Sequence, residues 1–193
     1  MNVAAFLLAA GSATRFGSDK LLHALPHGVP IAVQALRHMR VVFDKGVLVV
    51  VRTGTKDLSE RLRGEGCEIV VCEKADQGMG ESLACAVRAS GAADAYVIAL
   101  ADMPFIRSSS IAAVRDALLR GSSLVAPYFR ARRGHPVGMS SKFRSELENL
   151  SGDEGARTLL AAHQAELVKV PVGDPGVIRD VDTPGDLAPP LIV

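Results

Sequence analysis

The sequence that decides the fold reads Val3-Ala4-Ala5-Phe6-Leu7-Leu8-Ala9-Ala10-Gly11-Ser12-Ala13-Thr14-Arg15-Phe16-Gly17-Ser18-Asp19-Lys20. It begins as a short apolar run, which is too brief for a helix core and typical of a strand buried on both faces. It then breaks into small and polar residues, with glycines at 11 and 17 and cations at 15 and 20. A buried strand that ends in such a loop presents backbone N–H groups and positive charge to a phosphate. The stretch therefore predicts a loop that holds a nucleoside triphosphate, with a solvated loop carrying incidental cations as the alternative.

The size and charge of the chain exclude several classes of protein. Its 193 residues fit one domain with a sizeable core. A net charge of +1 gives no global attraction to nucleic acid or to an anionic membrane. No apolar run approaches the roughly 18 residues of a membrane-spanning helix. We therefore expect a cytoplasmic protein that binds neither nucleic acid nor a membrane.

The three cysteines, Cys67, Cys72 and Cys85, form no CxxC pair. Their odd number argues against a disulfide framework, so we expect reduced, structural thiols. Cys67 and Cys72 lie at an odd offset on a probable strand and should face opposite sides of it.

Apolar runs that alternate with helical patterns predict the fold class. Buried strands are expected in the apolar run that begins at Val3 and at residues 46–51, 67–72 and 95–100, with helices between them, one of which has the apolar stripe Met79, Leu83, Ala86 and Val87. Crossovers without hairpin signals indicate an α/β protein: a three-layer α/β/α arrangement with a mostly parallel, Rossmann-like sheet.

Beyond residue 121 the regular alternation of strand and helix patterns ends. A strand at 124–128 is followed by Arg130, Arg132 and Arg133, which predict a solvated turn or an anion contact. Short helices around 142–149 and 155–162, a strand at 167–170 and a strand end that enters a helix over 178–187 complete the pattern, with Asp182 or Thr183 as the cap of that helix. We expect one domain over residues 1–193, with a nucleotide-binding part at about 1–121 and an acceptor-side part at about 122–193.

Standard phosphate-binding motifs do not match the opening loop. A Walker A motif needs GxxxxGK[ST], but Phe16 stands five positions after Gly11. A dinucleotide-binding GxGxxG motif needs glycine at position 13, which is alanine, and the second strand ends in Arg52 where an NAD site has an acidic residue.

Carboxylates follow two of the later segments. Asp102 comes directly after a buried strand, where ligands bind in parallel sheets, and this rule brings the 11–20 loop, the 76–82 turn and Asp102 to one edge. A carboxylate in that place can hold Mg²⁺ together with substrate phosphates. Asp180 and Asp182 project from one face if the chain is extended, so one of them is a candidate second ligand; capping and turn formation are the alternatives.

Taken in order, the motifs resemble those of MobA-like nucleotidyltransferases, and more narrowly of molybdenum cofactor cytidylyltransferases. They are Leu8-Ala9-Ala10-Gly11, Arg15-Phe16-Gly17, Lys20-Leu21, Gln77-Gly78-Met79-Gly80-Glu81-Ser82-Leu83, Ala101-Asp102-Met103-Pro104, Gly134-His135-Pro136, the run from Gly152 to Arg157, and Asp180-Val181-Asp182-Thr183-Pro184. Alanine at position 13, where the family usually has serine, and alanine at position 101, where glycine is common, are departures from it.

The resemblance implies a nucleotide-diphospho-sugar transferase-like fold and transfer of CMP from CTP to the phosphate of molybdopterin, with Mg²⁺ or Mn²⁺ and release of pyrophosphate. It implies catalytic roles for Arg15, Lys20 and Asp102, with Asp102 and Asp182 as metal ligands. The implied nucleotide-binding residues are Leu8, Ala9, Ala10, Gly11, Ser12, Gly78, Met79 and Ser82. His135 and Asp180 would lie on the acceptor side.

Some alternatives remain open. Leu-Ala-Ala-Gly resembles the cytidylyltransferases and Leu-Ala-Gly-Gly the guanylyltransferases, so Ala10 favours CTP over GTP. Another phosphorylated acceptor, or a non-catalytic chaperone that delivers the cofactor to a molybdoenzyme or works with its maturation factor, are the competing interpretations.

Overall fold

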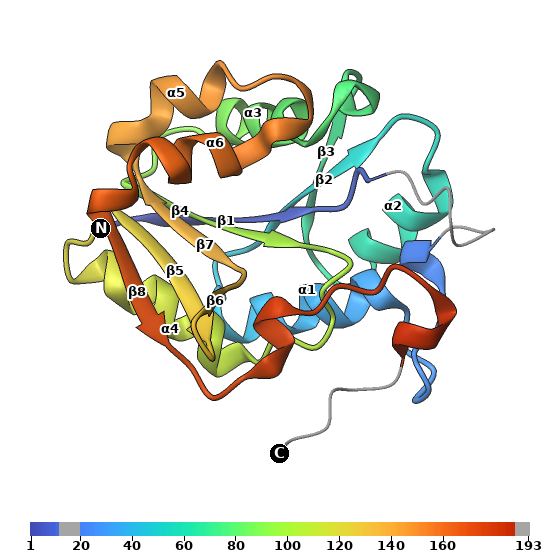
Figure 1. The fold of residues 1–193 in the computed structure, drawn as a ribbon. Coiled ribbons are helices and arrows are strands. Elements are labelled where there is room, and N and C mark those ends of the chain that lie inside the picture. The colour runs from blue at the N-terminus through green and yellow to red at the C-terminus, as the bar shows by residue number, and fades with distance from the viewer. Residues whose placement is uncertain (12–19, 188–193) are drawn as a thin grey trace.

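The computed structural model describes residues 1–11 and 20–187 (Figure 1). Within these residues eight strands form one sheet in the order β3-β2-β1-β4-β7-β5-β6, and β8 pairs with β5. Strand β1 (Val3–Leu8) lies between β2 (Leu48–Arg52) and β4 (Ala95–Leu100), while β3 (Glu68–Cys72) extends the sheet beyond β2. These four strands pair in parallel, as the crossover pattern predicts.

The position of β4 creates the feature that matters for ligand binding. The chain builds β1, β2 and β3 in one direction across the sheet and then returns to the other side of β1 for β4. Leu8 and Leu100, the last residues of β1 and β4, lie opposite each other in the parallel register. Connections therefore leave in opposite directions from the carboxyl ends of β1 and β4, and such a switch point opens a crevice for ligands.

The second part of the sheet is partly antiparallel. Strands β5 (Leu124–Phe129), β6 (Arg132–Arg133) and β7 (Val137–Ser140) pair antiparallel, and β7 joins them to β4. Strand β8 (Leu167–Pro171) returns parallel to β5. The expected basic turn is the two-residue connection of a hairpin, in which Arg130 and Ala131 adopt φ angles of 46° and 66°. Neither residue type signals such a turn, which usually takes Asn or Gly, so the sequence did not predict the hairpin.

Helices cover both faces of the sheet (Figure 1). One core cluster contains residues of α1 (Ile31–Val42), α2 (Lys56–Arg63) and α4 (Ser108–Leu119), and the other contains residues of α3 (Met79–Ala89), α5 (Arg144–Glu148) and α6 (Gly155–Ala162). Ala5 and Leu7 of β1 belong to the first cluster, and Phe6 and Leu8 to the second. This alternation confirms a three-layer α/β/α arrangement with a strand buried on both faces.

Short 3₁₀ helices connect the main elements. They are η1 (Lys20–Leu22), η2 (Ala75–Gln77), η3 (Ser141–Phe143), η4 (Gly152–Glu154), η5 (Gln164–Glu166), η6 (Pro175–Ile178) and η7 (Pro184–Leu187). In the part of the chain that the structure describes, no helix is long and apolar enough to cross a membrane.

Three expectations about local structure need correction. Residues 178–187 contain neither a strand nor an α-helix: Ile178 ends η6, residues 179–183 form a loop, and a helix does begin at Pro184 but is the short 3₁₀ helix η7. Asp182 or Thr183 was expected to accept hydrogen bonds as the helix cap. Instead, the Asp186 carboxylate accepts hydrogen bonds from the Thr183 main-chain N–H at 2.8 Å and from the Thr183 hydroxyl at 2.7 Å. Met79 does not continue the buried stripe of Leu83, Ala86 and Val87, because at the first position of α3 it is 45% exposed.

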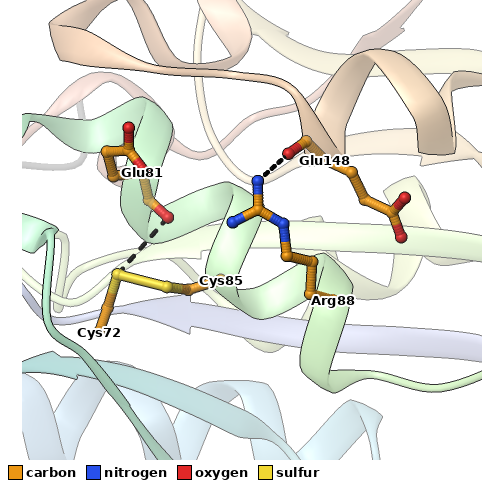
Figure 2. The surroundings of a disulfide bond; sticks show 5 residues. All are labelled: Cys72, Glu81, Cys85, Arg88 and Glu148. Carbon is orange, nitrogen blue, oxygen red and sulfur yellow. Dashed lines mark hydrogen bonds between the residues drawn. A yellow bond between two sulfur atoms is a disulfide. The ribbon is translucent and has the colours of Figure 1, made fainter.

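The expectation of three reduced thiols was also wrong. Cys72 and Cys85 form a disulfide across a Cα–Cα distance of 6.1 Å, while Cys67 is free (Figure 2). Cys72 ends β3 and Cys85 lies on α3, so their proximity depends on how the helix packs on the sheet, which sequence spacing does not reveal. As expected, Cys67 and Cys72 face opposite core clusters.

Candidate functional site

A cavity of about 390 Å³ lies at the switch point of the sheet. Its walls come from the ends of β1, β2 and β4, from η1, from the segment that connects β3 to α3, and from two loops of the C-terminal part. The lining residues are Leu8, Ala10, Gly11, Lys20, Leu21, Arg52, Ala75, Asp76, Gly78, Met79, Ser82, Leu100, Asp102, Asp153 and Asp182. Gly11 and Lys20, the two described residues of the 11–20 loop, line the cavity together with residues of the 76–82 turn and Asp102, as the predicted edge requires.

A lysine and two aspartates form the charged centre of this cavity. The Lys20 ammonium lies 3.0 Å from Oδ2 of Asp102 and 3.2 Å from Oδ1 of Asp182. The Lys20 side chain is only 12% exposed, and this burial alone would lower its pKa. Charge attraction and hydrogen bonds from Asp102 and then Asp182 outweigh burial and raise the pKa of Lys20 above its ordinary value, so the side chain is an ammonium.

Main-chain hydrogen bonds set the positions of the two aspartates. The Ala101 N–H donates to the carbonyl oxygen of Leu8 at 3.0 Å, which continues the β1–β4 ladder up to Asp102. The Val181 N–H donates to the carbonyl oxygen of Asp102 at 2.8 Å and brings the C-terminal loop to the same place. The turn that carries Asp182 is closed by Asp186, whose pKa is lowered by the hydrogen bonds from Thr183.

Alternate residues at the end of β1 line the cavity. Leu8 and Ala10 point into it with Gly11 beside them, whereas Ala9 is buried in the opposite core cluster and does not line the cavity. The Ala9 N–H is already bonded to the carbonyl oxygen of Val50 at 2.8 Å. Ser12 and Arg15 lie outside the described residues, so their assigned roles stay predictions.

The opposite wall depends on close packing between two loops. Gly78 has a φ of 129°, and a Cβ atom there would overlap the main-chain carbonyl of Gly152. A Cβ atom on Gly80 would lie 2.7 Å from the carbonyl oxygen of Ser151. Glycine at both positions therefore lets the start of α3 touch η4. The contact places Met79 and Ser82 on the cavity wall, together with Asp153 from η4.

The two acceptor-side residues, His135 and Asp180, do not line the cavity. Burial lowers the pKa of His135 to about 4, with a further contribution from Arg133, so its imidazole is neutral at pH 7. Among the described residues its buried Nδ1 atom has no hydrogen-bond partner, and its main-chain N–H donates to the carbonyl oxygen of Val177 at 2.8 Å. Partial desolvation, followed by the charges of Asp182 and Asp102, raises the pKa of the Asp180 carboxyl.

Three further charged residues line the cavity, and none of them was given an individual role from the sequence: Arg52, Asp76 and Asp153. Arg52 is the last residue of β2, a parallel strand, so its position at the carboxyl end was a usable signal. Asp76 lies in the glycine-rich turn, and Asp153 lies in the Gly152–Arg157 run that the family resemblance includes. Over residues 1–11 and 20–187, no cluster of three or more His, Cys, Asp or Glu side chains could hold a metal ion. Within these residues, Asp102 and Asp182 are the carboxylates that share the Lys20 ammonium in the cavity.

A doubly wound sheet with a charged cavity at its switch point is the architecture of a nucleotide-binding α/β protein. The model of the MobA-like NTP transferase domain matches residues 5–167 of the chain. The protein therefore belongs to the MobA-like NTP transferase family, which confirms the family resemblance and nucleotidyl transfer as the class of reaction.

Relatives and solved structures agree with this assignment. The chain is 33% identical over 189 residues to the purine catabolism protein PucB of Bacillus subtilis (strain 168), covering 92% of this chain and 90% of that protein. It is 27% identical over 189 residues to nicotine blue oxidoreductase of Paenarthrobacter nicotinovorans, covering 94% of this chain and 92% of that protein.

The crystal structure of Rv0371c from Mycobacterium tuberculosis H37Rv has the same fold, with a TM-score of 0.81 at 24% identity over 96% of this chain and 94% of that one. A second structure of that protein, described as a complex with manganese, gives a TM-score of 0.78 at 23% identity over 96% of both chains.

Proposed function

We propose that the protein is a cytidylyltransferase, which transfers CMP from CTP to the terminal phosphate of molybdopterin and releases pyrophosphate. The observation that carries this proposal is the placement of Lys20 between Asp102 and Asp182 at the switch-point cavity of a MobA-like NTP transferase. An oxygen of the acceptor phosphate attacks the α-phosphorus of CTP, and the bond to the β-phosphate oxygen breaks. Both reactants are anionic, so positioning and positive charge dominate the catalysis.

Lys20 supplies that charge from within the cavity. Its ammonium is held protonated, and it neutralises the triphosphate and the charge that develops on the leaving pyrophosphate. Arg15 is assigned the same role from the opening loop. Gly78, Met79 and Ser82 border the base and sugar, and the backbone around Ala10 and Gly11 faces the base or phosphates. No serine or cysteine nucleophile is needed for this reaction.

The Asp102–Asp182 pair fits a divalent cation. Both carboxylates contact the same ammonium, so their oxygens are close together, and carboxylate oxygens are the ligands that Mg²⁺ and Mn²⁺ prefer. A site with few protein ligands suits Mg²⁺, which keeps waters and binds substrate phosphates. Such an ion would neutralise phosphate charge and orient the phosphates for in-line transfer. The manganese complex of the fold relative Rv0371c supports metal binding in this fold.

Ala10 supports CTP as the nucleotide. Its methyl group lies on the cavity wall, where glycine would leave more room, and it therefore favours the smaller pyrimidine base. Molybdopterin as the acceptor depends on the narrower family resemblance, with His135 and Asp180 on the acceptor side. The relatives are named for purine catabolism and for an oxidoreductase, so the acceptor needs a direct test.

A thermal-shift panel tests the nucleotide. CTP, GTP, ATP, UTP and NADPH are compared with and without Mg²⁺ on the full chain. We expect the largest stabilisation from CTP with Mg²⁺, because a ligand that binds only the folded state raises its stability. Selective stabilisation by GTP would overturn the argument from Ala10, and stabilisation by NADPH alone would favour an oxidoreductase.

A further inference from the structure

The disulfide brackets the part of the chain that forms one wall of the cavity. Cys72 is the last residue of β3, and Cys85 lies on α3, 13 positions later (Figure 2). The residues that line the cavity between them are Ala75, Asp76, Gly78, Met79 and Ser82. No other pair of the three cysteines is joined, and Cys67 lies before β3, outside the bracketed segment.

The two sulfur atoms differ in accessibility. Cys72 is 1% exposed and belongs to the core cluster between the sheet and α3, whereas Cys85 is only partly buried. The Cys72 sulfur also lies 3.6 Å from the carbonyl oxygen of Glu81 (Figure 2). When the bond is reduced, that carbonyl can accept a weak hydrogen bond from the Cys72 thiol, so the reduced form has a partner in the core. Chemical attack from solvent is expected at Cys85.

The rest of α3 is held independently of the disulfide. One turn beyond Cys85, the Arg88 guanidinium donates to the main-chain carbonyl of Glu148, at the end of α5 (Figure 2). Leu83, Ala86 and Val87 are buried against the sheet. Breaking the disulfide therefore leaves the helix docked and mainly frees the segment from Glu73 to Gln77, which carries Ala75 and Asp76 of the cavity wall.

We infer that Cys72 and Cys85 form a reversible redox modification site that controls the order of this segment. A low-molecular-weight disulfide such as glutathione disulfide is the oxidant. The Cys85 thiolate attacks one sulfur of this disulfide and displaces one thiol, and Cys72 then attacks the Cys85 sulfur and displaces the second thiol. Two protein thiols are oxidised to one disulfide, and one glutathione disulfide is reduced to two glutathione molecules. A cytoplasmic location, as the sequence predicts, suits a switching pair of this kind better than a permanent cross-link.

The consequence for the cavity depends on the proposed function. In the oxidised protein the wall is held in place, and less ordering is needed when a nucleotide binds. We therefore expect CTP to bind about threefold or more weakly to the reduced protein. The reduced protein should also unfold at a temperature about 5 °C or more lower, since the cross-link no longer restricts the unfolded chain.

The exchange itself is tested without nucleotide. The native full chain is equilibrated in buffers of varied glutathione to glutathione disulfide ratio, quenched with acid, alkylated and mapped by mass spectrometry. We expect Cys72 and Cys85 to change together and reversibly, in the wild type and in the matched control Cys67→Ser. A pair that stays reduced, or stays oxidised, at every ratio would overturn the proposal, as would a bond between Cys67 and either partner.

The coupling is tested by CTP titration of oxidised and reduced protein with Mg²⁺. Cys85→Ser should behave like the reduced wild type in both buffers, while Cys67→Ser should respond as the wild type does. Equal CTP affinity in both redox states would contradict the coupling. Absence of CTP binding in both states would instead count against the proposed function, and the alkylation result would stand separately.

Discussion

The main-chain N–H of Val181 donates a 2.8 Å hydrogen bond to the carbonyl oxygen of Asp102. This bond joins the loop that carries Asp182 to the end of β4, and the Ala101–Leu8 bond joins that end to β1. The carboxylates that contact Lys20 are thus positioned by backbone, not by each other's side chains. Substitutions of these side chains should remove their charge and leave the segments in place.

Lys20→Ala should lower the turnover of nucleotidyl transfer by about 100-fold or more, since it removes a cation that stabilises the transition state. Steady-state kinetics measures this, with circular dichroism to confirm the fold. Lys45→Ala is the matched control, because Lys45 is exposed in the turn after α1. Near-normal turnover in both Lys20→Ala and Asp102→Ala would refute the assignment of the site.

Asp182→Asn should raise the Mg²⁺ concentration required for half-maximal activity, because an amide is a weaker ligand than a carboxylate. A Mg²⁺ titration at saturating CTP measures the change. Asp180→Asn is the control: this residue lies two positions away and does not line the cavity. A larger effect from Asp180→Asn would show that the second ligand was assigned to the wrong aspartate.

Gly78→Ala should destabilise the protein more than Gly54→Ala does. Both glycines have positive φ, at 129° and 79°, but only Gly78 packs where a Cβ atom would meet another loop. We expect the free energy of unfolding to fall by about 1 kcal/mol in Gly54→Ala and by about 2 kcal/mol or more in Gly78→Ala. Urea unfolding measures both, and equal losses would mean that the contact with Gly152 contributes little.

His135 should make stability depend on pH below neutrality. Its pKa is about 4 in the folded protein, against 6.5 for an ordinary histidine, mainly because of burial; Arg133 lowers it further, and Asp180 opposes the shift. Between these values the unfolded chain binds more protons, so stability is complete above pH 6.5 and falls as the pH drops toward 4. The free energy of unfolding should fall by at most about 3 kcal/mol because of this shift in the pKa of His135. The free energy of unfolding, measured at pH 7.5, 6 and 5, should fall less steeply with falling pH in His135→Gln than in the wild type. An equally steep fall in both proteins would exclude His135 as the cause.

The parallel part of the fold was predictable because its signals are local. Strands β1 (Val3–Leu8) and β4 (Ala95–Leu100) are uninterrupted apolar runs, and the observed bounds of β4 match the predicted ones. The shared location of Lys20 and Asp102 at one edge of the sheet was predictable from the rule that ligands bind at the carboxyl ends of parallel strands. That Lys20 contacts both aspartates depends on how three distant segments pack, which no spacing shows.

The remaining features depend on tertiary context. The hairpin at Arg130–Ala131 uses residues that rarely adopt positive φ, so the antiparallel strands gave no turn signal. Met79 has the spacing of a core residue, but at the first position of α3 it is exposed and lines the cavity. The proximity of Cys72 and Cys85 likewise depends on how α3 packs on the sheet.

The most direct test of the central claim is product analysis of the full chain with CTP, Mg²⁺ and molybdopterin. The account predicts equal amounts of pyrophosphate and a molybdopterin cytosine dinucleotide, identified by mass, with loss of both in Lys20→Ala. Binding of CTP and molybdopterin without release of pyrophosphate, in a preparation that folds normally, would contradict it.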